Sequence, residues 1–122
     1  MHIDHVANVC RDAAATTHFY RELLGLPLTE VDHGGQHMLV FKLPAGGMLV
    51  FTVSDDTPPP STDERDWQRR HIGLTVANAA ELDPWLTRLR AHGIRHQLVD
   101  NERIYFADPD GVVLELEVAP PT

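Results

Sequence analysis

The order of predicted strands and helices occurs twice along the chain. Strand segments alternate or are rich in β-branched residues, and each helical segment has apolar residues at helical spacing and ends at a glycine. The first half predicts a strand at residues 3–9, a helix at 11–25 and strands at 27–32, 37–43 and 48–53. The second half predicts a strand at 71–76, a helix at 78–93 and strands at 94–99, 103–108 and 112–118. Two βαβββ halves restrict the chain to α+β folds in which equivalent modules pack together.

A polar, proline-rich stretch without periodicity separates the halves, as is typical of a linker. We therefore predict a single domain over residues 1–122, with a first module at 1–53, a linker at 54–69 and a second module at 70–122. Neither module alone has enough core to fold well. The expected α+β fold is a curved mixed sheet shared by both modules, a half-open barrel with the helices outside.

Composition excludes several classes of partner. The 122 residues include 18 acidic and 10 basic side chains, and this net charge of −8 repels nucleic acid and anionic lipid. No apolar run reaches the roughly 20 residues that a membrane span needs. The only cysteine, Cys10, cannot form an internal disulfide, and the first residues do not resemble a secretory signal. We expect a cytoplasmic protein that binds neither nucleic acid nor membrane.

Strand alternation predicts that three potential metal ligands face the inside of the curved sheet. His5 and His71 begin equivalent strands of the two modules, and Glu115 lies between two leucines of the last strand. Two imidazoles and a carboxylate form the facial triad that suits Fe(II), and Mn(II) or Zn(II) can also occupy it. A single strand histidine is more often solvated than a ligand, but equivalent positions in a repeat favour metal binding. Glu117 is the weaker carboxylate candidate, because it lies nearer the strand end.

Four motifs resemble those of the vicinal oxygen chelate superfamily: "DHVANV", "FYRELLGL", "RRHIGLTV" and "FADPDGVVLELEV". That superfamily includes glyoxalase I, methylmalonyl-CoA epimerase, fosfomycin-resistance thiol transferases, extradiol dioxygenases and bleomycin-resistance binding proteins. The resemblance implies that His5, His71 and Glu115 hold a divalent metal, and that a small substrate binds it through two vicinal oxygens. It also implies a homodimer, in which modules pair either within a chain or between chains.

Residues 94–115 resemble the extradiol dioxygenase pattern I-R-H-x7-I-Y-x2-D-P-x-G-x3-E at every element. By this resemblance, Tyr105 and His96 are the catalytic residues that hydrogen-bond the bound catecholate and the oxygen-derived intermediate. Alternation also predicts an inward-facing Tyr105. Ring-cleaving relatives have a further acid/base histidine near the end of the first module, but residues 48–70 contain none, so His37 or His96 would have to compensate.

Two other enzymatic branches fit the sequence less well. Glyoxalase I and the epimerase use a fourth ligand where this chain has Val50, which cannot coordinate a metal. Fosfomycin-resistance relatives carry a threonine two residues after the first ligand, where this chain has Ala7. Ring-opening dioxygenation is therefore the leading prediction, with glyoxalase, lyase or thiol-transferase activity below it.

A protein that sequesters an antibiotic is the alternative from a different class. Bleomycin-resistance relatives bind no metal and hold the drug between aromatic residues of a dimer groove. Trp67 and Trp85 could contribute to such a groove, and an acidic chain suits a cationic drug. Trp85 is also in phase with the apolar side of its helix, which predicts packing instead. Those binding proteins usually lack the triad, so His5, His71 and Glu115 favour the enzyme.

Overall fold

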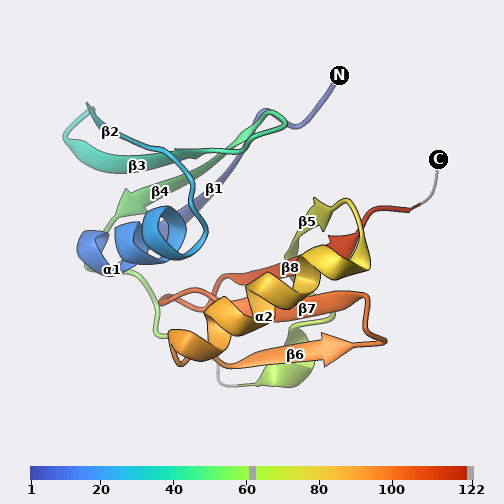
Figure 1. The fold of residues 1–122 in the computed structure, drawn as a ribbon. Coiled ribbons are helices and arrows are strands. Elements are labelled where there is room, and N and C mark those ends of the chain that lie inside the picture. The colour runs from blue at the N-terminus through green and yellow to red at the C-terminus, as the bar shows by residue number, and fades with distance from the viewer. Residues whose placement is uncertain (61–62, 121–122) are drawn as a thin grey trace. The chain divides into compact units, whose positions relative to one another are not determined.

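The computed structural model describes residues 1–60 and 63–120, which form two compact units. Unit 1 spans Met1–Pro59 and unit 2 spans Pro60–Thr122, so the boundary falls inside the stretch predicted as a linker. Residues 61 and 62 of that stretch, like 121 and 122, lie outside the described residues. Each unit contains one βαβββ module, which confirms the α+β class and the duplicated order (Figure 1).

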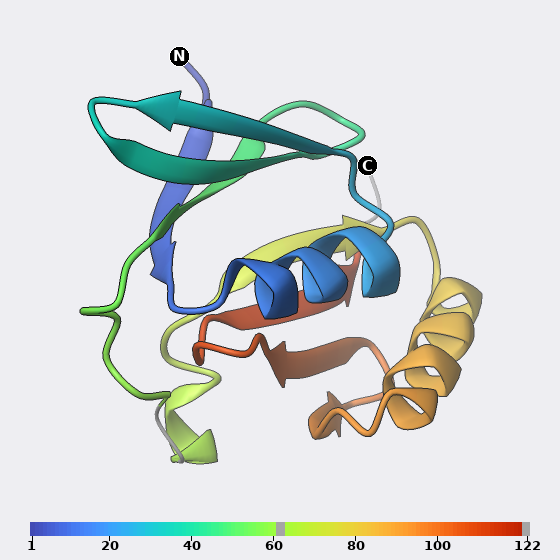
Figure 2. The same ribbon diagram turned by 90° about the vertical axis from the view of Figure 1, so that its left-hand side faces the viewer.

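Unit 1 is a four-stranded mixed sheet with a helical segment on one side (Figure 2). Its strand order is β1-β4-β3-β2, in which β1 runs parallel to β4 and the other neighbours are antiparallel. The elements in chain order are β1 (His5–Cys10), α1 (Ala13–Thr17), the π-helical η1 (His18–Leu23), β2 (Leu28–His33), β3 (Gln36–Lys42) and β4 (Met48–Val53).

The first helix begins as its sequence predicts. Asp12 caps it, because its carboxylate accepts hydrogen bonds from the backbone N–H groups of Ala14 at 2.9 Å and Ala15 at 3.2 Å. From His18 onward the helix has π-helical geometry, which its apolar spacing does not reveal. It ends before Gly25, whose φ of 75° suits a residue without a side chain.

Aromatic side chains form the centre of the core of unit 1. The ring of Tyr20 lies 5.2 Å from that of Phe41 and 4.7 Å from that of Phe51, measured between centroids. All three side chains are fully buried. The helical segment is thereby packed on the sheet face that carries Phe41 and Phe51, and His5 alternates onto the opposite face.

Unit 2 repeats this architecture with a sheet of order β5-β8-β7-β6. Its helix α2 lies across one face of the sheet (Figure 1). The elements in chain order are the 3₁₀ turn η2 (Glu64–Asp66), β5 (Ile72–Val76), the 3₁₀ turn η3 (Ala79–Glu81), α2 (Leu82–Ala91), β6 (His96–Val99), β7 (Arg103–Ala107) and β8 (Val113–Val118). No helix within residues 1–60 or 63–120 is long and apolar enough to cross a bilayer.

The second helix starts later than its sequence predicts. Residues 79–81 form a 3₁₀ turn, and the Glu81 carboxylate accepts a hydrogen bond from the Ala77 backbone N–H at 2.7 Å. Pro84 falls in the first turn of α2, where a backbone N–H would have no hydrogen-bond partner within the helix, so proline is tolerated. One side of the helix is buried, through Leu82, Leu86 and Leu89.

The two faces of the sheet in unit 2 carry different chemistry. The face beneath α2 is apolar and buried, through Ile104, Phe106, Leu114 and Leu116. On the other face, Gly73, Glu115, Tyr105 and Gln97 lie side by side across β5, β8, β7 and β6. This is the alternation predicted for Glu115 and Tyr105. We call this face the site face.

Candidate functional site

A tight turn fixes the register that brings Tyr105 opposite Glu115. In the sequence Asp-Pro-Asp-Gly, the carboxylate Oδ1 of Asp108 accepts hydrogen bonds from the N–H groups of Asp110 and Val112, both at 2.9 Å. Gly111 takes a φ of 88°, which a side chain would disfavour. The turn holds the ends of β7 and β8 together. The relative positions of Tyr105 and Glu115 are therefore set by the backbone of the two strands.

A histidine and a glutamate form the centre of the site face. His71 Nε2 lies 3.6 Å from Glu115 Oε1, and the Glu115 side chain is almost completely buried. The other ring nitrogen of His71, Nδ1, lies 3.0 Å from the backbone carbonyl oxygen of Trp67. A carbonyl oxygen can only accept, so Nδ1 donates to it, and Nε2 is the ring nitrogen that faces Glu115.

Tyr105 completes this cluster. Its ring lies edge-on to that of His71, with centroids 5.2 Å apart, and only 3% of the residue is exposed. A hydrogen bond to the Glu115 carboxylate raises the pKa of the Tyr105 phenol, and burial raises it further, against the lowering effect of Arg103. The phenol therefore stays protonated at neutral pH and donates to Glu115.

His5 in unit 1, like His71 in unit 2, has its Nδ1 next to an oxygen acceptor. Its Nδ1 lies 2.9 Å from the Asp4 carboxylate oxygen Oδ2, which leaves Nε2 for another partner. Histidine ligands usually hold their second ring nitrogen against a carboxylate or carbonyl oxygen in this way. The His5 side chain is 53% exposed. In both histidines, Nε2 is therefore the ring nitrogen that could coordinate a metal.

The donor atoms on the site face fit a divalent cation. Ligand bonds of about 2.0–2.2 Å place neighbouring donor atoms roughly 3 Å apart, and the separation of His71 Nε2 and Glu115 Oε1 is 3.6 Å. An imidazole with a carboxylate suits Fe(II), Mn(II) and Zn(II). Within each unit, the described residues contain no group of three His, Cys, Asp or Glu side chains close enough to hold a metal. Unit 2 alone therefore offers two candidate ligands, His71 and Glu115.

The structure does not bring His96 to the site face. In the pairing of β6 with β7, His96 lies opposite Phe106, and Gln97 lies opposite Tyr105. The ring of His96 is therefore on the face that packs beneath α2, and its Nδ1 lies 2.9 Å from the Ile94 carbonyl oxygen. A strand reverses face at every residue, so the one-residue register separates His96 from Tyr105.

Gly73 belongs to the site, although its role was not predicted. A Cβ atom at this position would lie 3.3 Å from Glu115 Oε1, so the missing side chain leaves room for the carboxylate. The backbone of Gly73 does not need a positive φ. A glycine inside a predicted strand was the available signal, because it often marks a close approach. Glu117 lies one pair further along the site face, opposite Thr75 and Arg103.

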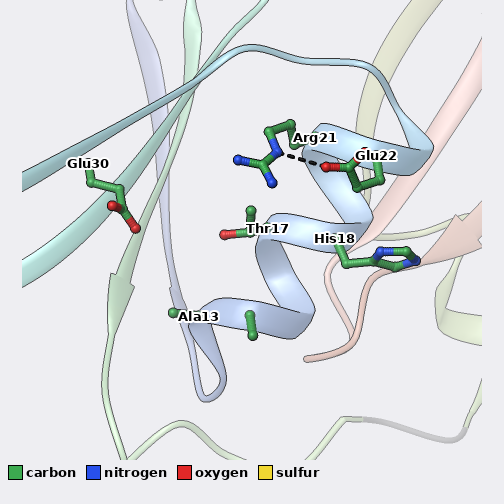
Figure 3. Close-up of a pocket in the computed structure, with 7 residues that line it drawn as sticks. Ala13, Thr17, His18, Arg21, Glu22 and Glu30 are labelled. Atoms are coloured by element: carbon green, nitrogen blue, oxygen red, sulfur yellow. Dashed lines mark hydrogen bonds and ion pairs between the residues drawn. The ribbon is translucent and has the colours of Figure 1, made fainter.

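A hollow lies on the surface of unit 1, between the helical segment and β2 (Figure 3). It is lined by Ala13, Ala14, Thr17, His18, Arg21, Glu22 and Glu30. Arg21 Nε lies 2.9 Å from Glu22 Oε1, so these two charges neutralise each other. The hollow is on the helix side of the sheet and contains none of the predicted ligands.

Comparisons with known proteins define the class of this fold and then its family. Similar solved structures include a glyoxalase family protein from Enterococcus faecalis, 28% identical with a TM-score of 0.72, covering 95% of this chain and 96% of that chain. A glyoxalase/dioxygenase from Nostoc punctiforme is 23% identical with a TM-score of 0.76, covering 98% and 92%. The fosfomycin resistance protein FosX from Listeria monocytogenes is 19% identical with a TM-score of 0.75, also covering 98% and 92%.

These structures share the duplicated βαβββ fold, which makes the chain a two-module α+β protein of the glyoxalase type. The profile of the Glyoxalase/Bleomycin resistance protein/Dioxygenase superfamily matches residues 2–116. The chain belongs to this superfamily, which is the vicinal oxygen chelate superfamily that its motifs resemble.

Proposed function

We propose that the protein is a metal-dependent enzyme that binds a small substrate through two vicinal oxygens. The observation that carries this proposal is the pair of His71 Nε2 and Glu115 Oε1 at 3.6 Å, with His71 Nδ1 held by the Trp67 carbonyl. Such an arrangement fixes the ring orientation and the tautomer that a metal ligand requires.

The proposed ligands are His71, Glu115 and His5, whose Nδ1 is held by Asp4. Fe(II) is favoured by this ligand set, with Mn(II) and Zn(II) as alternatives. When bound, the ion would act as a Lewis acid toward the two substrate oxygens. A variant of the similar protein FosX has been solved in complex with Mn(II) and 1S,2S-dihydroxypropylphosphonic acid.

Tyr105 is the proposed catalytic residue beside these ligands. Its phenol keeps its proton at neutral pH, because the hydrogen bond to Glu115 raises its pKa. The phenol has one O–H, which it would turn from Glu115 to a substrate oxygen that gains negative charge, and its buried ring holds it in place. Its role is to orient and stabilise that oxygen.

Ring opening of a catechol is the reaction that we propose first, on the resemblance of residues 94–115 to the extradiol pattern. His96 has no part in this proposal, since its ring is on the α2 side of the sheet. His37 lies on the helix side of unit 1, between Asp32 and Glu30, and does not replace it. In this proposal, Tyr105 is the site-face residue that donates a proton or a hydrogen bond to the substrate.

Sequestration of an antibiotic has less support from the tryptophans. Trp67 is 4% exposed and offers no open ring face. Trp85 lies on α2 with the guanidinium of Arg88 4.7 Å from its ring centroid. Trp67 is thus buried, the half-buried Trp85 is in contact with Arg88, and both His71 and Glu115 are present.

Metal content tests the proposed ligands directly. Protein purified without chelator should bind one Mn(II) or Fe(II) per chain, and Glu115→Ala should abolish this binding, because a three-ligand site loses most of its affinity with one ligand. Glu117→Ala removes the same charge from the same strand and should retain the metal. Full occupancy in folded Glu115→Ala protein would exclude this site.

The reaction is tested on protein loaded with Fe(II). Catechol should bind anaerobically, and admission of air should yield a yellow ring-opened product. Tight stoichiometric binding of a cationic antibiotic by metal-free protein, without turnover of catechol, would favour sequestration instead.

A further inference from the structure

One basic residue occupies the site face. Arg103 is the only arginine or lysine in the four strands of the sheet of unit 2. It lies two residues before Tyr105 in β7 and therefore on the same face, directly opposite Glu117 of β8. The residue is partly exposed, whereas Tyr105 and Glu115 are buried.

Three other arginines of unit 2 form ion pairs with nearby carboxylates: Arg65 with Asp63, Arg69 with Asp66, and Arg95 with Glu64. Arg103 differs from these three in its partners. Within the described part of the chain, Arg103 forms no ion pair, even though Glu117 is its cross-strand neighbour. Its hydrogen bond is to the Tyr105 phenol, a neutral group at physiological pH.

This placement leaves a guanidinium with unused donors beside the proposed metal ligands. A guanidinium has several N–H groups in a planar fork that matches a carboxylate or phosphonate, and one phenol oxygen cannot satisfy them all. The protein has a net charge of −8, so an anionic ligand would be repelled without a local cation. Arg103 provides that cation on the site face.

The spacing matches a small aromatic or aliphatic acid. Residues two apart in a strand are separated by roughly 6.7 Å, and Arg103 and Tyr105 have this relation along β7. A molecule whose vicinal oxygens lie at Tyr105 and Glu115 can therefore extend along β7 and place an anionic group at Arg103.

We propose that the substrate is an acid: it carries a carboxylate or phosphonate that Arg103 binds, in addition to the two vicinal oxygens that reach the metal ligands. This inference rests on the proposed function and specifies its substrate class. Arg103 is a specificity-determining residue in this scheme, because it selects acids from neutral chelators of the same size.

A matched pair of ligands tests the proposal. Mn(II)-loaded protein is titrated anaerobically by calorimetry with catechol and with 3,4-dihydroxybenzoate, which differ only by the carboxylate, and the metal content is measured after each titration. The wild type should bind the acid at least tenfold more tightly than catechol. Arg103→Gln should reduce this preference to less than twofold. A parallel titration with 3,4-dihydroxyphenylphosphonate decides between a carboxylate and a phosphonate.

Two further variants separate the guanidinium from charge in general. Arg90→Gln removes the same charge from α2, on the other side of the sheet, and should keep the full preference for the acid. Arg103→Lys should retain part of the preference, because an ammonium keeps the charge and loses the planar fork. Equal preference in the wild type and Arg103→Gln, or no preference in the wild type, would overturn the proposal.

Failure of the metal site would be recognised separately. If the wild type binds no Mn(II), the proposed function fails, and the anion site is then tested on metal-free protein with benzoate as the probe. A saturable shift of the Arg103 Nε–Hε NMR signal would support an anion site that is independent of metal. An unmoved signal at millimolar benzoate would refute it.

Discussion

At the scale of single residues, the site face depends on side chains that restrain each other. The Tyr105 phenol donates to the Glu115 carboxylate, and that carboxylate lies 3.6 Å from His71 Nε2. Alternation along β7 and β8 was sufficient to predict that Tyr105 and Glu115 share a face, because a side chain's direction follows from its position in the strand. Their hydrogen bond depends on the rotamers of both side chains, which the sequence does not specify.

Replacing Tyr105 by phenylalanine tests whether its hydroxyl acts in the reaction. The ring and its packing remain, so the metal content should be unchanged. The free energy of unfolding should fall by about 1 kcal/mol, the usual contribution of one hydrogen bond. Turnover of the ring-opening reaction should fall roughly ten- to a hundredfold, which corresponds to about 1.4–2.8 kcal/mol. Unchanged turnover would make the hydroxyl purely structural.

The stability difference between wild type and Tyr105→Phe should depend on pH. The pKa of this phenol is raised in the folded protein, chiefly by the hydrogen bond to Glu115, so the protonated phenol is favoured by folding. Its contribution is complete below the pKa of an unfolded tyrosine and is lost as the pH rises through the raised value. Urea unfolding at neutral and alkaline pH should show the difference shrinking in alkali.

Gly73→Ala should weaken metal binding without weakening the fold. The new Cβ would lie 3.3 Å from Glu115 Oε1 and displace the carboxylate by a few tenths of an ångström. Gly73 has no positive φ, so alanine should leave stability equal or raise it by about 0.4–1 kcal/mol. We expect several-fold weaker Mn(II) binding by calorimetry. Thr75→Ala, at the next site-face position of β5, is the control and should bind normally.

At the scale of elements, strand positions were more predictable than helix geometry. The strand predicted at 48–53 is observed as Met48–Val53, and the others agree within about two residues at each end. The predicted helix at 11–25 is instead a short α-helix followed by the π-helical η1. Hydrophobic spacing records which residues face the core, and it does not distinguish a hydrogen bond to the fourth residue from one to the fifth.

The register with which β6 pairs with β7 could not be predicted from the sequence. The resemblance to the extradiol pattern placed His96 and Tyr105 in one site, but pairing puts Gln97 opposite Tyr105. A shift of one residue reverses every side chain of a strand, and local sequence does not determine the pairing. The predicted positions of His71 and Glu115 did not depend on this register, because the short turn at Asp108 fixes β8 against β7 and β5 runs directly beside β8.

The turn between β7 and β8 should be a sensitive point for stability. Asp108→Ala removes the oxygen that accepts from the N–H groups of Asp110 and Val112 in a buried position. We expect the free energy of unfolding to fall by about 1–3 kcal/mol, as for unsatisfied buried donors. Asp108→Asn retains an oxygen at this position and should recover most of the loss. Equal urea midpoints for Asp108→Ala and the wild type would show that the turn does not depend on this carboxylate.

At the scale of the whole molecule, each unit has its own sheet and its own histidine at or directly before its first strand. Unit 2 supplies His71 and Glu115, and unit 1 carries His5. The proposed three-ligand site therefore needs both units, from one chain or from two chains of the expected homodimer. This distinction has consequences for subunit mixing, because a site made between chains can be restored by combining two inactive proteins.

Mixing His5→Ala with Glu115→Ala protein should reveal which arrangement holds, after unfolding and refolding the two variants together. If each site takes His5 from one chain and the other two ligands from its partner, a mixed dimer contains one intact site and one doubly altered site. Random pairing then restores about one quarter of the sites of an equal amount of wild type. If each chain completes its own site, every site in the mixture lacks a ligand, and no metal binding returns. Mn(II) binding measured on the dimer fraction from size exclusion distinguishes these outcomes, with co-refolded wild type as the control for recovery. We expect metal binding either at about one quarter of the wild-type value or not at all. Metal binding near the wild-type level in either variant alone would instead remove His5 or Glu115 from the proposed ligand set.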